Sequence, residues 1–167
     1  METCQRTDPP YAASERVMTE AFLDWHRDTL LCKLAGLTDE QLRWKHQPSG
    51  LTLLSLPKHL ALVETFWFQI RFTGETPSDL SIPIDWDAQW RIEPDDTTQA
   101  ILDRYNNVVE RSRAITAAAS LDDRAVDDTG REGLTLRWIL LHMIEETARH
   151  NGHADLIREA IDGETGE

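Results

Sequence analysis

Cysteine is scarce in this sequence, with only Cys4 and Cys32 among 167 residues. Two thiols cannot form the disulfide framework of a small secreted domain, and they cannot supply a cysteine-rich zinc site. Any metal site must therefore draw its ligands from nitrogen and carboxylate groups. The low cysteine content also favours a reducing compartment, so we expect the protein in the cytoplasm.

Basic residues and long apolar runs are also few. Seventeen lysines and arginines stand against 30 acidic residues, which gives a net charge of −13. Such a charge repels nucleic-acid phosphates and anionic lipid surfaces. No apolar run approaches the roughly 18 residues of a membrane-spanning helix, and the N-terminus lacks the pattern of a signal peptide. We therefore expect a soluble, unexported protein with neither nucleic acid nor a membrane as a partner.

Apolar residues recur at intervals of three and four over most of the chain, which is typical of amphipathic helices. We therefore predict an all-α protein whose long helices occupy residues 14–36, 53–73, 97–119 and 134–160. A chain of this length is sufficient for one domain with a sizeable core. The predicted organisation is an extended N-terminal arm, a single four-helix-bundle domain and a frayed tail, at residues 1–13, 14–163 and 164–167.

Local patterns support the helix boundaries. Ser14 is a candidate N-cap, and Thr38 to Gln41 has the form of a capping box that opens a short helical turn. In the second long helix the α-helical spacing predicts a core stripe of Leu56, Leu60, Val63, Trp67 and Ile70.

The segment from Glu75 to Asp96 is too irregular for a helix, because it contains three prolines. It is also long for a connection within a bundle. It is either a lid over one end of the bundle or a crossover packed by its tryptophans, Trp86 and Trp90. The crossover is the simpler interpretation.

The helix at 134–160 carries four polar side chains on one face, namely His142, Glu146, His150 and His153. At the helical repeat they lie within a sector of roughly 80°. Apolar residues extend this face at both ends, so it should point toward a partly buried cavity. Unpaired imidazole and carboxylate groups are costly in an apolar core. Either a hydrogen-bond network or a metal ion must therefore satisfy them.

A short sequence element occurs twice. Gly50-Leu-Thr-Leu recurs as Gly133-Leu-Thr-Leu, and in each copy a histidine follows nine residues after the glycine, at His59 and His142. If this is a true repeat, two equivalent helix pairs are related by a pseudo-twofold axis. The inward histidines of the two copies would then approach each other at one end of the bundle.

Glu146 and His150 have the i, i+4 spacing that lets one helix offer two ligands to an ion, and His59 on the facing helix could provide a third. Such a set suits zinc, nickel, iron or manganese and leaves positions open for water or substrate. The spacing alone is weak evidence, because helices often carry such pairs on solvated faces.

The pattern His142-x-x-x-Glu146-x-x-Arg149-His150-x-Gly152-His153 resembles the C-terminal motif of the DinB/YfiT-like superfamily of metalloenzymes. Residues 57–60, Pro-Lys-His-Leu, resemble the helix that carries the first histidine of that superfamily. Residues 22–25 and 36–42 are similar to its actinobacterial branch, and the resemblance spans residues 14–163.

The resemblance implies an up-down-down-up four-helix bundle with three metal ligands, at His59, Glu146 and His150. Most members have histidine where this chain has Glu146. A glutamate at that place is similar to the mycothiol-dependent maleylpyruvate isomerase of the same superfamily. The substitution is therefore compatible with metal binding, but it leaves the identity of the metal open.

By the same resemblance, the chain should be a metal-dependent enzyme, with zinc as the first choice and nickel, iron or manganese as alternatives. It would use a low-molecular-weight thiol such as mycothiol to attack a small-molecule electrophile, as an S-transferase or an isomerase. His142 and His153 are candidates to move the displaced proton. Arg149 and Trp138 are candidates for substrate binding.

Other interpretations remain open at this point. His142 could orient Glu146, serve as a reserve ligand or belong to the core, while His153 could orient a ligand or simply pack. Arg149 could pair with Glu145, and Trp138 could be a core residue. The whole site could instead use metal-bound hydroxide as a hydrolase. The polar stripe could also be non-catalytic and order the interface of a homodimer.

Overall fold

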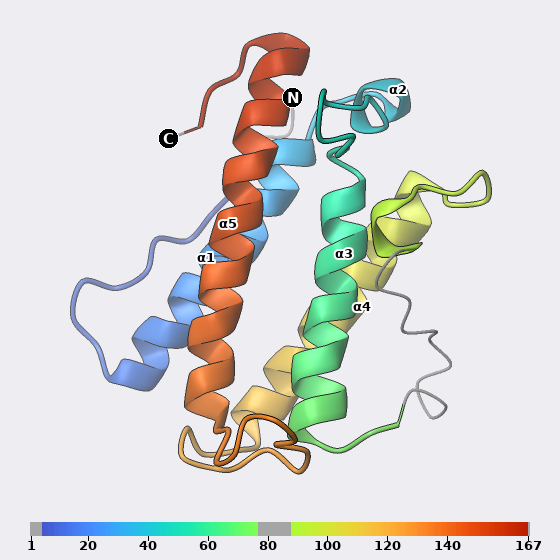
Figure 1. Cartoon of the computed structure of the whole chain (residues 1–167). Coiled ribbons are helices and arrows are strands. Elements are labelled where there is room, and N and C mark those ends of the chain that lie inside the picture. Colours follow the sequence, from blue (N-terminus) through green and yellow to red (C-terminus); the bar gives the residue numbers. More distant parts are fainter. Residues whose placement is uncertain (1–4, 77–87, 167) are drawn as a thin grey trace.

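The computed structural model describes residues 5–76 and 88–166, and the regular elements of these residues are all helical. Within them there is no β-strand, only an isolated bridge between Arg124 and Thr135. The predicted all-α fold class is confirmed. The elements appear in Figure 1 in the order α1 (Glu15–Leu34), α2 (Asp39–Leu42), α3 (Ser55–Glu64), η1 (Thr65–Phe72), η2 (Ala88–Trp90), α4 (Thr98–Ala117) and α5 (Leu136–Asp162).

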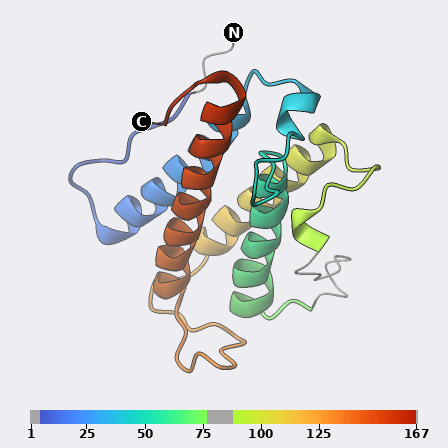
Figure 2. The ribbon, with the colours of Figure 1, turned by 45° about the horizontal axis from the view of Figure 1, so that its top comes forward.

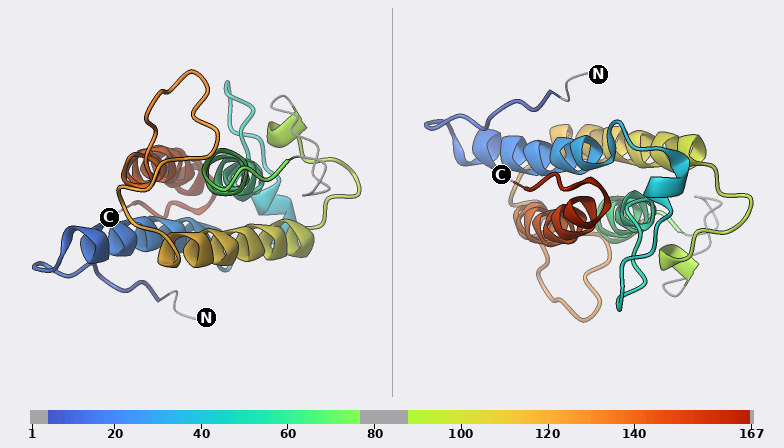
Figure 3. Two further views of the ribbon diagram at one scale, coloured as in Figure 1. Left: turned by 90° about the horizontal axis from the view of Figure 1, so that it is seen from below. Right: turned by 90° about the horizontal axis from the view of Figure 1, so that it is seen from above.

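The long helices form two layers. Figure 3 shows α3 and α5 side by side and nearly end-on, with α1 and α4 lying across them in the second layer. The closest packing joins α1 to α5 and α3 to α4, while α3 and α5 touch over a smaller region. α1 and α5 run in one direction along the molecule, and α3 and α4 run in the other (Figure 1). None of the described helices is long and apolar enough to cross a membrane.

The predicted helix starts agree with the caps that the structure contains. The side chains of Ser14, Thr97 and Thr135 accept hydrogen bonds from the first turns of α1, α4 and α5. Thr38 and Gln41 form the predicted capping box of α2. Because these bonds satisfy otherwise unpaired amide groups, the local sequence is enough to position the starts of α1, α2, α4 and α5.

The second long helix departs from its prediction, because it is α-helical only as far as Glu64 and continues as the π-helix η1. The wider turn of a π-helix rotates the following side chains away from the α-helical spacing. As a result Phe68 is fully buried, whereas Ile70, predicted in the core stripe, is only partly buried. The other stripe residues, from Leu56 to Trp67, are buried as predicted.

The repeated Gly-Leu-Thr-Leu element has the same local structure in both copies. Gly50 and Gly133 both have a positive φ, of 74° and 79°, which glycine adopts without steric strain. In each copy the threonine hydroxyl accepts a hydrogen bond from the amide three residues later, Thr52 from Ser55 at 3.0 Å and Thr135 from Trp138 at 3.4 Å. The repeat therefore encodes a common turn into α3 and α5.

Arg6 of the N-terminal arm and Arg158 near the end of α5 both contact α1 or its C-cap. Arg6 places its guanidinium 5.0 Å from the ring centre of Trp25, so the arm packs on the bundle. At the other end, buried Arg158 of α5 donates hydrogen bonds to the carbonyl groups of Lys33 and Ala35. Cys32 of α1 is disulfide-bonded, so the cysteine content no longer argues for a reducing compartment. Cys4 lies outside the described residues.

The apolar core consists of two clusters, one toward each end of the bundle. On α5, one cluster ends at Met143 and the other resumes at Ala154. Three of the four polar residues of the predicted stripe, Glu146, His150 and His153, occupy the interval between them. The core is therefore interrupted at the place where α3 and α5 face each other.

A buried ion pair links the two layers near the end of α3. Arg27 of α1 and Glu64 of α3 are 4% and 1% exposed, and they form two parallel hydrogen bonds of 2.8 Å. Arg27 also donates to Asp24 at 2.9 Å. Such a pair depends on both partners, because either charge left alone in the core would lack compensation.

We predict that Glu64→Gln lowers the free energy of unfolding by about 3–5 kcal/mol, because the buried charge of Arg27 then keeps only the partly exposed carboxylate of Asp24 as a counter-charge. The double variant Arg27→Met/Glu64→Leu should regain most of this loss. Urea unfolding followed by circular dichroism measures both. As a control, Glu145→Gln removes an exposed ion pair with Arg149 and a contact of 3.5 Å with His142, and it should cost less than about 1 kcal/mol. Equal stability of Glu64→Gln and wild type would contradict the prediction.

Candidate metal centre

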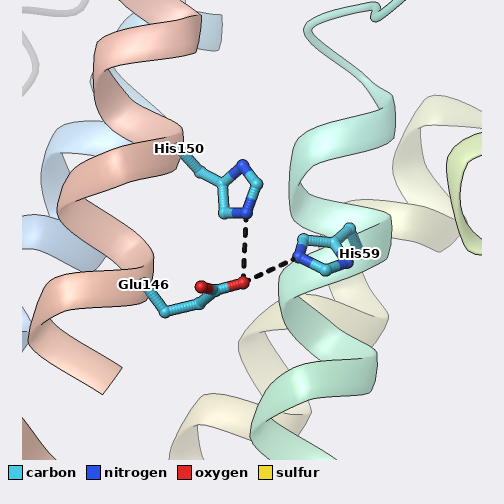
Figure 4. Close-up of side chains that lie close together, drawn as sticks. All are labelled: His59, Glu146 and His150. Atoms are coloured by element: carbon cyan, nitrogen blue, oxygen red, sulfur yellow. Dashed lines mark hydrogen bonds and ion pairs between the residues drawn. The ribbon is translucent and has the colours of Figure 1, made fainter. Parts of the chain in front are cut away.

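Three side chains converge where α3 and α5 face each other. His59 projects from α3, and Glu146 and His150 project from successive turns of α5 (Figure 4). Glu146 Oε1 lies 3.2 Å from His59 Nε2 and 3.2 Å from His150 Nε2. The structure thus brings together the three residues that the sequence analysis selected as metal ligands.

The surroundings of this triad are mostly closed to solvent. His59 and His150 are each 6% exposed, and Glu146 is half-buried. The two imidazole rings also pack edge to face, with 4.6 Å between their centroids. Because the apolar clusters lie on either side, the three polar groups have few other hydrogen-bonding partners besides one another.

The electrostatics favour a cation between these groups. The hydrogen bonds from His150 and His59 hold the pKa of Glu146 far below its usual range, so this side chain is an anion. A carboxylate and two imidazole nitrogens all offer lone pairs when the rings are neutral. Their close approach is favourable only if a proton or a metal ion is shared among them.

The spacing also fits a metal ion. The candidate ligand atoms lie within 4.8 Å of one another, and two of the three separations are 3.2 Å. In a tetrahedral zinc site with bonds of 2.0–2.1 Å, ligand atoms are about 3.4 Å apart. Two histidines and one carboxylate form a common donor set for catalytic zinc and for non-haem iron.

Gln89 fixes the orientation of His59. Its side-chain carbonyl accepts a hydrogen bond of 2.7 Å from His59 Nδ1. In a neutral ring the proton is then on Nδ1, and the lone pair of Nε2 points toward Glu146. Metal-binding histidines commonly hold their second nitrogen in this way. Gln89 is 7% exposed.

Trp90 covers the ring of His59. The two rings stack at 4.0 Å with an angle of 22°, and Trp90 also contacts His150 at 5.5 Å. Figure 2 shows the short helix η2, which carries both Gln89 and Trp90, beside α3. The segment that was predicted as a lid or a crossover thus supplies two residues to the site. Its part from residue 77 to 87, including Trp86, lies outside the described residues.

Gln89 was not predicted as a site residue. A lone glutamine in an irregular segment carries no spacing that relates it to a histidine 30 residues earlier. Trp90 was predicted only as one of the two tryptophans that could pack this segment against the bundle. Only the return of the chain across α3 brings either residue to His59.

His153 lies beside His150. The Nδ1 atoms of the two rings are 3.3 Å apart, so one ring donates a hydrogen bond to the other. Burial lowers the pKa of His153, and the nearby positive charges of His150 and Arg149 lower it further. A neutral His153 can accept the Nδ1 proton of His150 and leave Nε2 of His150 free to face Glu146. This contact matches the orienting role that the sequence analysis left open.

His142 and Trp138 lie together one turn and two turns before Glu146. Their rings stack at 5.0 Å with an angle of 18°, and Trp67 of η1 packs against both. His59 is in contact with His150 rather than with His142, so the predicted approach of the two repeat histidines is wrong. Glu146 and His150 lie one and two turns after His142 on α5, and these later residues are the ones that face His59.

Arg149 forms no described contact with the three converging side chains. Its side chain is 60% exposed and forms an ion pair with Glu145 on the same helix. This ion pair is the one that was predicted as the alternative to substrate binding by Arg149. Substrate binding by Arg149 or Trp138 and proton transfer by His142 or His153 stay predictions.

A family model described as Mycothiol-S-transferase matches residues 18–163. The chain belongs to the mycothiol S-transferase family. This family lies within the DinB/YfiT-like superfamily, so the resemblance noted in the sequence is confirmed. The match includes all three converging side chains and identifies a mycothiol-related transferase. A comparison with curated proteins finds no match.

We predict that His142 in this family member titrates below its ordinary pKa of 6.5. Burial lowers the pKa, and the charges of Glu146 and Glu145 only partly oppose this effect. The neutral ring is therefore favoured in the folded protein. The resulting stability is complete above pH 6.5 and is lost as the pH falls toward the lowered pKa. NMR titration of the His142 ring protons measures the midpoint, and a midpoint above 6.5 would contradict the prediction.

Proposed function

We propose that this protein is a divalent-metal-dependent transferase that joins a low-molecular-weight thiol of the mycothiol type to a small-molecule electrophile. The observation that carries the proposal is the convergence of His59, Glu146 and His150 on one point, in a chain of the mycothiol S-transferase family. Three protein ligands leave at least one coordination position for a substrate, which is the arrangement of catalytic sites.

The residues of the chain would divide the work between holding the ion and orienting its ligands. His59, Glu146 and His150 would bind the ion, with zinc as the expected metal and nickel, iron or manganese as alternatives. Gln89 and His153 would fix the two imidazole rings through their Nδ1 atoms. Trp90 would keep water from one face of His59. A bound divalent ion would supply the positive charge that lowers the pKa of a coordinated thiol.

In the proposed reaction, the S–H bond of the thiol breaks and a bond forms between sulfur and an electrophilic carbon. A neutral histidine accepts the proton, and the displaced electron pair leaves with the leaving group or stays on the electrophile as a carbanion that is then protonated. His142 suits the role of proton acceptor because burial favours its neutral form. In an isomerisation the same thiol would add and later depart, so it would be required but not consumed.

We predict that the wild-type protein, purified without an affinity tag, holds about one divalent ion per chain and that His150→Ala loses it. Elemental mass spectrometry of both proteins measures the content. His46→Ala is the matched control, because His46 lies in a loop, where its ring is near Ser49. Circular dichroism should show the same helix content in all three proteins. A wild type that holds no metal and takes up no added zinc, nickel or iron would exclude the proposed site.

Thiol dependence separates the proposed transferase from its two rivals. A transferase or isomerase turns over an electrophile only when a thiol such as mycothiol is added. A hydrolase that uses metal-bound hydroxide would turn over its substrate without thiol. A non-catalytic bundle would do neither, and would show an extensive association surface instead.

A second prediction concerns Gln89, which touches His59 but does not reach the other two side chains by any described hydrogen bond. Gln89→Ala should weaken metal binding by about 10- to 100-fold, because the ring of His59 loses its orienting partner. Competition with a chromogenic chelator measures the affinity. Gln99→Ala is the control, since the side chain of Gln99 bonds Asp103 on the exposed side of α4. Equal metal affinity of the two variants would show that Gln89 has no orienting role.

A further inference from the structure

A cationic and aromatic cluster lies beside the candidate metal centre. The guanidinium of Arg131 lies 4.6 Å from the ring centre of Trp138 and 5.4 Å from that of Trp67. The same two tryptophans pack against His142. These four side chains, here called the Arg131 cluster, come from η1, from the connector before α5 and from the first turns of α5.

Arg131 has no acidic partner among residues 5–76 and 88–166. Its main-chain amide bonds Asp128, but its guanidinium forms no ion pair within the described part of the chain. This is notable in a protein with 30 acidic residues and 17 basic ones. By contrast, the guanidinium of Arg149 is already occupied by Glu145. The forked donors of Arg131 are therefore available to an external anion.

The cluster borders a pocket of about 390 Å³. Arg131 and Trp138 line it, together with main-chain segments at Gly130 and Gly133. Glu132 also lines the pocket, and its negative charge opposes an anion there. The size suits a small molecule, and a tryptophan face favours a planar group.

The cluster and the metal centre share one face of α5, because Trp138, His142 and Glu146 follow one another at intervals of four residues. The helical rise places Trp138 and Glu146 about 12 Å apart along the axis. Both charges act on His142, since Glu146 raises its pKa and Arg131 lowers it. A small elongated molecule could therefore extend from Arg131 toward the metal centre.

We propose that the Arg131 cluster binds the carboxylate end of a flat, conjugated or aromatic electrophile whose reactive carbon extends toward His59, Glu146 and His150. The proposal rests on the proposed transferase function and adds the chemical class of its electrophile. A guanidinium recognises a carboxylate through two parallel hydrogen bonds, and the tryptophan rings select planar groups. The strongly negative net charge disfavours anions elsewhere on the protein, so a local cation is needed.

The test uses trans-cinnamate as an unreactive probe on the full chain, without metal and without thiol. Isothermal titration measures its affinity, and the indole N–H signals of Trp67 and Trp138 report its location by NMR. We expect cinnamate to bind at least tenfold more tightly than the neutral cinnamyl alcohol. We also expect Arg131→Gln to abolish this preference, and Glu132→Gln to tighten cinnamate binding.

Two further variants complete the test. Arg124→Gln is the matched control, because Arg124 is an exposed arginine of the same connector that does not line the pocket, and it should leave the affinity unchanged. Arg131→Lys keeps the charge without the fork and should bind with intermediate affinity. Equal affinity for the acid and the alcohol would overturn the proposal, as would loss of cinnamate binding in Arg149→Gln but not in Arg131→Gln. Because the probe needs neither metal nor thiol, these outcomes are independent of whether the protein is a transferase.

Discussion

The contact between Glu146 and the two histidines is the constraint on which the functional part of this structure depends. It places an ionised carboxylate between His59 and His150, at the interval between two apolar clusters. Taking such groups out of water is costly, and the cost is offset only if they share a cation and if their remaining hydrogen-bonding atoms are paired. Gln89 and His153 provide that pairing at the Nδ1 atom of each ring. The same features would make the site ready to bind a metal ion.

The aromatic side chains around this contact have a consistent arrangement along α5. Trp90 covers the side of His59 and His150, while Trp67 and Trp138 pack around His142, one turn before Glu146. The polar side chains of α5 therefore have aromatic rings on both sides. In the proposed reaction, this arrangement would restrict water near the thiol and would guide a planar electrophile along the helix. Arg131 would then select for a carboxylate at the far end.

Much of the fold could be predicted because it depends on local chemistry. Ser14, Thr38 and Thr135 cap their helices through bonds to residues three positions away, so the signal lies within one turn of sequence. The partial exposure of Ile70, by contrast, could not be predicted from such a local pattern. The change from α3 to the π-helix η1 shifts which side chains are buried, and the α-helical period contains no information about it.

The candidate site divides in the same way. Glu146 and His150 could be placed on one helix face from the sequence, because the fixed helical repeat gives residues four apart nearly the same direction. His59 was a candidate third ligand from the facing helix, and the resemblance to a known family supported that choice. The fold was needed to show that His142 packs with Trp138 rather than joining the triad, and that Gln89 and Trp90 lie beside His59. These contacts join segments far apart in the chain, and their geometry is set by the packing of α3 and η2 rather than by any local pattern.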